Sequence, residues 1–259
     1  MSIHLFEFED FKWFPNAIRA GGTDYLRHFF KATNLYKPVI PLILNALEKS
    51  NETTIIDLCS GGGGPIEEVY KNLKKSAGQN FSIILTDKFP NINAYNYLKS
   101  KTKGQISFKN FSVDAEKVPM ELKGFRTIFS AIHHFRPQAI KHILKNAVDS
   151  NTGIGIFDGG DKNILLLPGI IILHPIALFI CTPFFKPFKF SRIFFTYIIP
   201  LIPLLTVWDG CVSILRLYKP KQLLKLAMEV ENKNYVWKAG KVKNRFGLNV
   251  AYLIGYPAL

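Results

Sequence analysis

The residues best suited to chemistry in this chain are four consecutive glycines that follow an apolar run. Residues 53–58 read TTIIDL, which predicts a buried strand with a carboxylate, Asp57, near its end. The glycines occupy positions 61–64, and Pro65 with two glutamates then opens a predicted helix. A strand that runs into a glycine turn and a helix brings backbone N–H groups close to a nucleotide in α/β folds. The spacing of the glycines indicates which nucleotide that is.

This spacing excludes two common nucleotide-binding loops. A dinucleotide fingerprint needs G-x-G-x-x-G, and the two possible frames place Ile66 or Glu67 where the third glycine belongs. A P-loop needs Lys-Ser or Lys-Thr after its glycines, and Pro65 with Ile66 stands there instead. Neither kind of site is therefore predicted.

The glycine run resembles instead the D/E-x-G-x-G-x-G motif of class I S-adenosylmethionine-dependent methyltransferases. Asp57, Cys59, Gly61 and Gly63 occupy its positions, with Cys59 in place of the first glycine. In that family the loop packs against the methionine part of the cofactor. The alternative interpretation is a glycine-rich loop that binds no ligand.

Two further carboxylates follow in the order that the resemblance implies. The run 83–85 predicts a buried strand that ends at Asp87, about 20 residues beyond the glycines, where a carboxylate can accept hydrogen bonds from ribose hydroxyls. The alternative for Asp87 is a helix N-cap before Pro90. For Asp114 and Ala115 the resemblance implies a contact with the adenine amine, and the alternative is a loop cap. The predicted cofactor contacts are Asp57, Cys59, Ser60, Gly61, Gly63, Asp87, Lys88, Asp114, Ala115 and Ser130.

Two adjacent histidines are the first candidate catalytic residues. An apolar strand over residues 127–130 leads into His133, His134 and Phe135. Many methyltransferases of this family carry a similar segment after their fourth strand, at the rim of the site. A histidine there could take a proton from a substrate hydroxyl or amine, because its pKa lies near neutrality. The alternative for each histidine is a packing or capping role.

The remaining strands complete the prediction of an α/β fold. Residues 153–157 read as a fifth strand, and 235–238 and 248–256 read as two strands joined by a basic loop. By resemblance to the methyltransferases we expect a seven-stranded, mostly parallel Rossmann-like sheet with a C-terminal antiparallel hairpin, an N-terminal helical cap and an apolar helical insertion. The expected domains are a cap over residues 1–50, a cofactor-binding domain over 51–160 and 217–259, and the insertion over 161–216.

The insertion is long and nearly free of charge. No Asp, Glu, Lys or Arg occurs from residue 163 to 185 or from 193 to 208. The first run has the roughly 20 residues that a spanning helix requires, but its prolines disfavour a straight helix. We expect broken helices whose apolar face enters the lipid while Lys186, Lys189 and Arg192 meet anionic headgroups. The alternatives are a lid over a lipophilic substrate, an oligomer interface, and a spanning hairpin, which would move these cations against the positive-inside tendency.

Polar residues beside the apolar runs are candidate substrate contacts. Asp209 and Arg216 follow the second run, where they could orient a polar headgroup, and Asp209 could act as a base. The alternative is an Asp–Arg pair that fixes the insertion to the body. In the N-terminal helices, Arg19 or Tyr25 could reach the methionine carboxylate or the substrate, with aromatic core packing as the alternative.

Composition limits the choice of partners. The formal net charge of +14 fits an anionic membrane surface or nucleic acid, but no RNA-binding module is recognisable, so nucleic acid is not the expected partner. Three widely spaced cysteines, and no His/Asp/Glu cluster with ligand spacing, indicate reduced cytosolic thiols and no metal site. The N-terminus carries acidic residues where a secretory signal has basic ones, so we expect no such signal.

The predicted function is metal-independent transfer of a methyl group from S-adenosylmethionine to an O or N atom of a lipophilic small molecule or lipid. We expect a cytoplasmic protein held peripherally or monotopically on the inner face of the membrane. Methylation of protein or RNA, and a non-catalytic cofactor-binding membrane scaffold, are the open alternatives. The N/D-P-P-Y sequence typical of amine or nucleobase methylation is absent at residues 130–133, which read SAIH.

Overall fold

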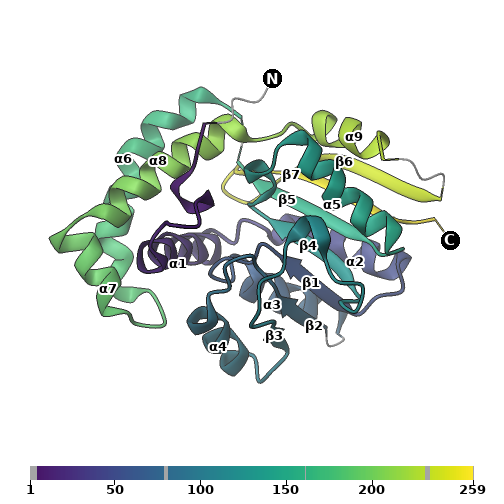
Figure 1. The fold of residues 1–259 in the computed structure, drawn as a ribbon, viewed down its shortest axis with the longest axis horizontal. Coiled ribbons are helices and arrows are strands. Elements are labelled where there is room, and N and C mark those ends of the chain that lie inside the picture. The colour runs from purple at the N-terminus through teal and green to yellow at the C-terminus, as the bar shows by residue number, and fades with distance from the viewer. Residues whose placement is uncertain (1–4, 79–80, 161, 231–233, 259) are drawn as a thin grey trace.

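A single seven-stranded sheet forms the centre of the molecule in the computed structural model, which describes residues 5–78, 81–160, 162–230 and 234–258 (Figure 1). The strands are β1 Thr54–Leu58, β2 Ser82–Leu85, β3 Ile106–Phe108, β4 Phe125–Phe129, β5 Ile154–Gly159, β6 Tyr235–Lys243 and β7 Asn249–Pro257. Their order is β3-β2-β1-β4-β5-β7-β6. The first five are parallel, and β7 runs antiparallel to both β5 and β6. The predicted fold class is confirmed, including the C-terminal hairpin.

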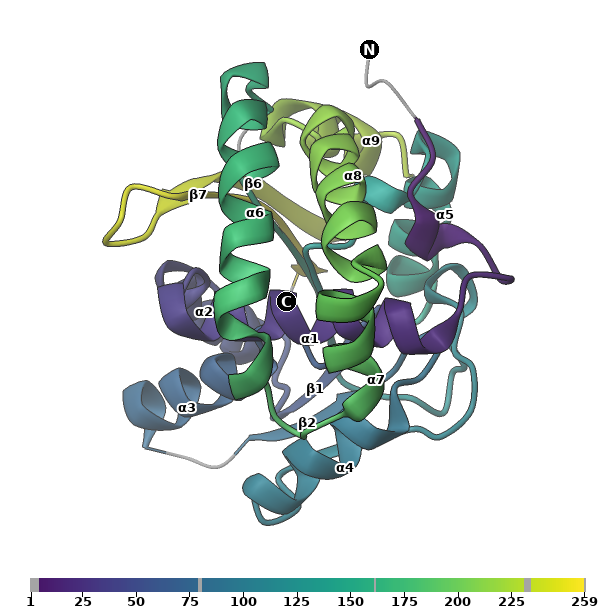
Figure 2. The same ribbon diagram turned by 90° about the vertical axis from the view of Figure 1, so that its left-hand side faces the viewer.

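The helices cover both faces of the sheet and form a further layer beside it. They are α1 Asn16–Thr33, α2 Ile40–Lys49, α3 Ile66–Ala77, α4 Ile92–Lys101, α5 Pro137–Asp149, α6 Leu167–Cys181, α7 Phe190–Ile193, α8 Leu201–Arg216 and α9 Pro220–Met228. One buried cluster joins α2, α3 and α4 to the sheet, and another joins α5 and α9 to it. The helices α1, α6, α7 and α8 gather at one side of the sheet (Figures 1 and 2).

The loops that follow β1 and β4 meet at the carboxyl edge of the sheet. Strand order reverses between these two neighbours, because β2 and β3 lie beyond β1 while β5 lies beyond β4. Ligands of doubly wound sheets bind in the crevice at such a switch point. The loop after β1 holds the glycines and the loop after β4 holds His133 and His134, so the fold brings the two predicted groups to one edge.

Two long helices, α6 and α8, lie side by side in the insertion (Figure 2). The helical segment Ile164–Phe184 has 21 residues, a mean hydropathy of 2.6 and only 6% of its apolar window buried, so it is long and apolar enough to cross a membrane. The second half, Phe190–Ile198 with Leu201–Arg216, is bent by 82° at its break. The bend agrees with the expectation of broken helices, while contact with lipid remains a prediction.

One side of the insertion packs on α1. Phe14, Ile18 and Tyr25 form a third buried cluster with Leu178, Phe185 and Ile202 of the insertion. A Cβ atom added at Gly21 would lie 2.3 Å from Cδ1 of Ile202, so the glycine permits this close approach of α1 and α8. The opposite side is exposed, with Ile172 and Leu173 showing 60% and 63% of their surface.

Two of the three cations between the insertion helices do not point outward as expected, whereas Lys186 is exposed. Arg192 is buried, and its guanidinium lies 2.6 Å from a carboxylate oxygen of Asp24 in α1. Lys189 lies 3.0 Å from the same carboxylate, and Arg27 pairs with it as well. Charges buried in this way require partners, because an isolated one loses its hydration without compensation. The expectation that Lys189 and Arg192 meet lipid headgroups is therefore wrong, and these residues fasten the insertion to α1.

Candidate functional site

The glycine loop has a backbone conformation that glycine favours. Gly61 and Gly63 have φ values of 51° and 93°. A Cβ atom at Gly63 would lie 2.3 Å from a methyl carbon of Leu98. Cys59, which replaces the first glycine of the motif, has a φ of 56°, so it adopts the left-handed region at an energetic cost that a glycine would not have.

The carboxylate of Asp57 holds this loop through hydrogen bonds. It accepts hydrogen bonds from the hydroxyls of Ser60, at 2.6 Å, and Thr127, at 2.8 Å. Burial raises the pKa of Asp57 to about 7, and these two hydrogen bonds oppose that shift. Asp57 and Ser60 therefore hold the loop after β1 against the neighbouring strand β4.

Asp87 follows β2 and lies beside the same loop. One carboxylate oxygen accepts the N–H of Gly61 at 2.7 Å, and the other accepts the N–H of Phe89 at 2.7 Å. Burial raises the pKa of Asp87. Each oxygen keeps acceptor capacity for a further donor, such as a ribose hydroxyl. The N-cap of α4 is Asn91 and not Asp87, so the capping alternative does not describe this carboxylate.

The third predicted carboxylate, Asp114, has a capping role. It accepts the N–H of Glu116 as the N-cap of a short helix that starts at Ala115, and it pairs with Lys88 at 3.1 Å. This is the loop-cap alternative, and it leaves Lys88 and Asp114 at the rim of the site. Ser130, at the end of β4, has a φ of 47° and hydrogen-bonds to Tyr36, a residue that the sequence analysis did not select.

Helix α1 lies over the glycine loop. A Cβ atom added at Gly61 or Gly62 would contact Thr23 at 3.4 or 3.0 Å. Arg19 lies one turn earlier, 4.5 Å above the ring of Phe89, and donates to the carbonyl of Phe11. Arg19 therefore lies near the predicted cofactor contacts.

Tyr25, in contrast, lies in the cluster between α1 and the insertion. Its ring contacts those of His174 and Phe185, and only 3% of the residue is exposed. Core packing, the alternative given for Tyr25, describes this position.

His133 forms a buried pair with Asp158, the carboxylate near the end of β5. Its Nδ1 atom lies 2.9 Å from a carboxylate oxygen, and both side chains are buried. In the neutral imidazole this contact places the proton on Nδ1 and leaves Nε2 as the acceptor. Asp158 was not predicted, although its place near the end of the expected fifth strand, beside the histidine loop, was the available signal.

His134 is held by residues 5–14, which we call the N-terminal strap. Its Nδ1 atom lies 2.8 Å from Asp10 and 3.5 Å from Glu7. Although burial opposes the charged form, these carboxylates raise the pKa of His134 to about 10. Arg216 joins the cluster, 3.0 Å from Glu7 and 2.8 Å from Asp10.

Asp209 completes the attachment of the strap. Its carboxylate accepts the backbone N–H groups of Phe8 and Glu9. Asp209 and Arg216 thus each bind the strap to α8. The alternative interpretation was instead an ion pair between these two residues. Burial raises the pKa of Glu9 to about 8, and neighbouring Asp209 acts in the same direction.

Glu7, His133 and His134 place one possible ligand atom each within 4.8 Å of one another. Two imidazoles and a carboxylate suit a divalent transition metal. Glu7, however, already pairs with Arg216, whose cation opposes a metal ion at this position. The spacing of the sequence did not indicate this group, because Glu7 lies far from the histidines along the chain.

Comparison with known proteins supports the fold. No protein-family model matches the chain, and no curated protein matches it. Human N-acetylserotonin methyltransferase in complex with S-adenosylmethionine superposes with a TM-score of 0.52 at 12% identity, over 95% of this chain and 57% of that one. The methyltransferase domain of bacterial CtHen1-C has a TM-score of 0.50 at 13% identity, over 86% and 98%. A Rhodobacter sphaeroides structure described as a putative Zn-dependent alcohol dehydrogenase also reaches 0.50 at 12% identity, over 93% and 98%.

These similarities define the class of the fold and nothing finer. The chain has the class I S-adenosylmethionine-dependent methyltransferase fold, with the seven-stranded mixed sheet and the terminal hairpin. It spans a little over half the length of the human enzyme. At 12–13% identity neither the reaction nor the substrate transfers from these structures, and activity has to be argued from the site.

Proposed function

We propose that the protein transfers a methyl group from S-adenosylmethionine to an O or N atom of a lipophilic acceptor. One observation carries this proposal: the glycine loop with Asp87 and the buried His133–Asp158 pair occupy the same edge of the sheet, around the switch point between β1 and β4. The first group suits a nucleoside cofactor and the second suits proton removal from a nucleophile.

The residues at the switch point fit the cofactor. At Gly64, in the glycine loop, an added Cβ atom would meet nothing within 4 Å, so there is open space beside the loop at this residue. Asp87 supplies acceptors for ribose hydroxyls, and Asp114 with Ala115 lies at the rim where the adenine is expected. Bound S-adenosylmethionine would supply the electrophilic methyl group at this edge.

The His133–Asp158 pair suits the role of general base. The Nε2 atom of His133 accepts the proton of a substrate hydroxyl or ammonium, and the carboxylate of Asp158 stabilises the imidazolium that results. Asp158 also fixes the ring orientation, because it holds Nδ1. His134 has a different role, since its pKa of about 10 keeps it protonated at neutral pH.

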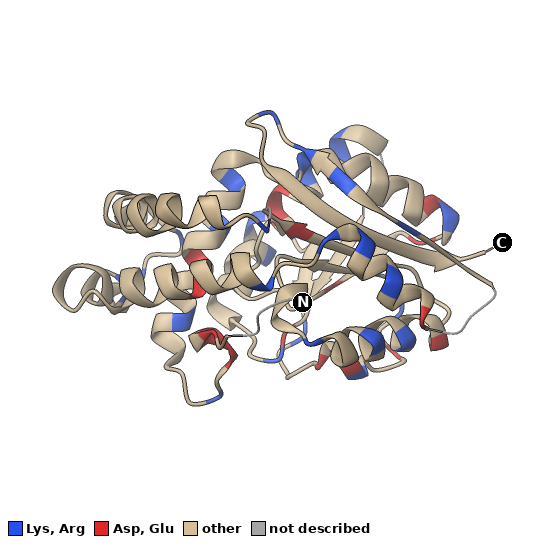
Figure 3. Cartoon of the chain, turned by 90° about the horizontal axis from the view of Figure 1, so that it is seen from above, with Lys and Arg blue, Asp and Glu red and all other residues tan. Residues whose placement is uncertain are grey.

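We further propose that the exposed side of the insertion lies on the cytoplasmic surface of a membrane. The helices α6 and α8 carry almost no charge along their length (Figure 3). The exposed residues are large and apolar, including Ile172, Leu173 and Ile176. A surface of this kind, attached to a basic body, favours insertion into the upper part of an anionic leaflet.

The attachment to α1 argues against a spanning hairpin. Lys189 and Arg192 lie near the middle of the insertion's sequence, far along the chain from the sheet. Both are paired with Asp24 of α1. The insertion helices could not cross a bilayer without breaking this buried cluster or taking α1 with them. A surface-lying arrangement keeps the cluster intact and opens the acceptor side of the sheet toward the lipid.

Calorimetry with S-adenosylhomocysteine tests the cofactor site. We expect binding by the wild type, and loss of binding in Gly63→Val and Asp87→Ala. Gly247→Val is the matched control, because Gly247 also has a positive φ (78°) but an added Cβ atom meets nothing within 4 Å. If the wild type does not bind, or if both site variants bind as well as Gly247→Val, the proposed cofactor is wrong.

Incubation with methyl-labelled cofactor and a total lipid extract, followed by mass spectrometry, tests the acceptor. We expect a labelled lipophilic product that is lost in His133→Gln. Label in protein or RNA instead would support the polymer alternative. S-adenosylhomocysteine binding with no labelled product in any fraction would support a non-catalytic scaffold.

A further inference from the structure

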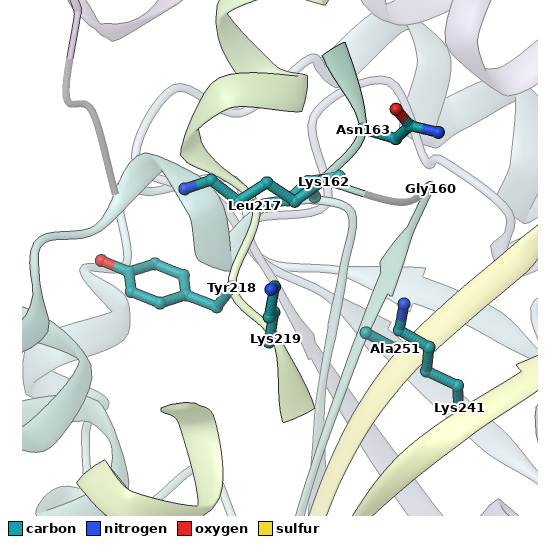
Figure 4. A pocket seen from close by; sticks show the side chains of 8 residues that line it. All are labelled: Gly160, Lys162, Asn163, Leu217, Tyr218, Lys219, Lys241 and Ala251. Atoms are coloured by element: carbon teal, nitrogen blue, oxygen red, sulfur yellow. The ribbon is translucent and has the colours of Figure 1, made fainter. Parts of the chain in front are cut away.

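The insertion contacts the rest of the protein in two separate places. Its two ends lie beside the sheet, where they form a cavity of about 310 Å³ with the terminal hairpin (Figure 4). Its middle lies against α1, which runs between the insertion helices and the sheet (Figures 1 and 2). This second contact extends to the glycine loop through the side chain of Arg27.

The guanidinium of Arg27 joins the glycine loop to the insertion. Its Nη1 atom donates to the carbonyl of Gly62 at 2.8 Å, and its Nη2 atom donates to the carbonyl of Lys186. Nη2 also lies 3.0 Å from a carboxylate oxygen of Asp24. Arg27 is 7% exposed and Asp24 is fully buried, so these hydrogen bonds form at low dielectric, where they are stronger than in water.

The peptide group between Gly62 and Gly63 is held at both of its polar atoms. Arg27 binds the carbonyl oxygen, and the N–H of Gly63 donates to the carbonyl of Ser60 at 2.7 Å. Because a peptide group is planar, these two contacts fix its orientation. The glycines on either side would otherwise allow it to rotate. Arg27 and Ser60 together therefore determine which polar groups the loop presents to a ligand.

On the side of the insertion, three consecutive carbonyls accept from two buried arginines. We call Phe185, Lys186 and Pro187 the attachment turn. Arg192 donates to the carbonyls of Phe185, at 2.6 Å, and Pro187, at 3.0 Å. Arg27 donates to the carbonyl of Lys186, which lies between them in the chain. Arg192 thus holds the turn in the position in which this carbonyl faces Arg27.

A second cavity, of about 220 Å³, lies beside this contact. Its walls include Arg27, Phe185 and Lys186, together with Gly64 and Pro65 at the end of the glycine loop. The contact is therefore not packed on all sides, and the attachment turn has room to move relative to the loop. Such a movement would remove one acceptor of Arg27 and release its guanidinium from the orientation that reaches the loop.

From these contacts we propose that Arg27 is a positioning residue of the glycine loop, and that the insertion controls the conformation of this loop through it. The affinity for the cofactor then depends on how the attachment turn lies on α1. By linkage, the bound cofactor stabilises that position of the turn by the same factor. This inference rests on the proposed cofactor site, but the first measurement below requires no cofactor.

Three variants, each with an arginine changed to lysine, test this link. Arg27→Lys keeps the charge but removes the planar fork that binds several acceptors at once. Arg192→Lys likewise keeps the charge but cannot hold both carbonyls of the attachment turn in the same way. Arg126→Lys is the matched control, because Arg126 is a buried arginine of β4 whose guanidinium donates to Asn146 and Ser150.

Hydrogen exchange of the amides of residues 61–64, without cofactor, measures the loop itself. We expect exchange to be about 10-fold faster in Arg27→Lys and Arg192→Lys than in the wild type, because each change loosens the peptide group that Arg27 holds. Arg126→Lys should exchange as the wild type does. If Arg192→Lys exchanges no faster than Arg126→Lys, the insertion does not act on the loop and the proposal is wrong.

Calorimetry with S-adenosylhomocysteine measures the consequence for the cofactor. Arg27→Lys and Arg192→Lys should each bind about 10-fold more weakly than the wild type, since a charge-assisted hydrogen bond to the loop is lost or misplaced. Arg126→Lys should stay within about 3-fold of the wild type. The double variant should bind no more weakly than Arg27→Lys alone, because both changes act through one contact. Losses that multiply to about 100-fold would show two independent effects and overturn the proposal.

Two further outcomes separate this inference from the proposed function. If the wild type does not bind S-adenosylhomocysteine but loop exchange changes as expected, the proposed cofactor is wrong and control of the loop by the insertion is supported. If the wild type binds it and Arg27→Lys binds equally well, the cofactor is supported and this inference is wrong.

Thermal unfolding verifies that the variants fold. If Arg27→Lys does not fold, Arg27→Gln replaces it, because Asp24 then still pairs with Lys189 and Arg192. If Arg192→Lys does not fold, Phe185→Leu replaces it, because the ring of Phe185 lies 5.3 Å from the guanidinium of Arg192 and its loss alters the same turn. The expected exchange rates and affinities are the same for these replacements.

Discussion

The Nδ1 atom of His133, in the loop after β4, lies 2.9 Å from a carboxylate oxygen of Asp158, near the end of the neighbouring parallel strand β5. The carboxylate fixes the ring and leaves Nε2 free to accept a proton. In the proposed reaction, Asp158 is a positioning residue and His133 would contact the acceptor.

His133→Gln and Asp158→Asn should therefore lower kcat by roughly 100-fold or more, because each removes general-base assistance. S-adenosylhomocysteine affinity, measured by calorimetry, should stay unchanged, since neither residue belongs to the glycine loop. His142→Gln is the control, because His142 is an exposed histidine of α5. Equal loss of cofactor binding and kcat would point to a structural role instead.

The ion-pair cluster of the strap predicts a pH dependence of stability. The folded pKa of His134 is about 10 and that of Glu9 is about 8, above their ordinary values of 6.5 and 4.5. Both groups therefore bind more protons in the folded state, and the stability that they add is lost as the pH rises, through about 8 for Glu9 and about 10 for His134. Glu7, Asp10 and Arg216 are the other charged groups of this cluster.

Thermal melting from pH 5 to 10 measures this effect. The difference in Tm between the wild type and His134→Gln should be largest near pH 6 and should shrink toward pH 10. The Tm of Glu9→Gln should rise relative to that of the wild type as the pH increases from 5 to 8. A difference that is constant across this range would contradict the assignment, and His142→Gln provides the baseline for an exposed histidine.

Apolar runs in the sequence predicted the individual strands, and the glycine spacing predicted the loop in which Gly61 and Gly63 have positive φ values. The arrangement of the strands in one seven-stranded sheet was implied by the resemblance to the methyltransferases. The strap was not predicted, since its contacts join Glu7 to Arg216 across nearly the whole chain. The sequence also does not show whether a cation faces solvent or a buried carboxylate. Arg192 was therefore placed at a lipid surface, although Asp24 neutralises it inside the molecule.

Asp24→Asn should destabilise the attachment of the insertion to α1. The substitution leaves Arg192 buried without a countercharge, and breaking such a pair costs about 3–5 kcal/mol. Chemical denaturation measures the loss. Asp149→Asn is the matched control, because it breaks an exposed pair with Lys145 and should cost at most about 1 kcal/mol. Similar losses in both variants would show that the Asp24 cluster does not hold the insertion.

The exposed side of α6 gives the sharpest test of membrane association. Ile172→Asn with Leu173→Asn and Ile176→Asn should leave the folded state within about 1–2 kcal/mol of the wild type, because all three side chains are at least half exposed. The control triple, Phe111→Asn with Met120→Asn and Met228→Asn, removes equally exposed apolar side chains from outside the insertion.

If the side chains of α6 enter lipid, the first triple should lower the partition coefficient onto phosphatidylcholine–phosphatidylglycerol vesicles by about 100-fold, since burial of each such side chain contributes on the order of 1 kcal/mol or more. The control triple should bind as the wild type does. Size-exclusion chromatography separates the remaining alternative. If the wild type does not bind vesicles but forms a dimer, and if only the α6 triple dissociates that dimer, the exposed side of α6 is an interface between copies of the chain. The same apolar area would then be buried against protein.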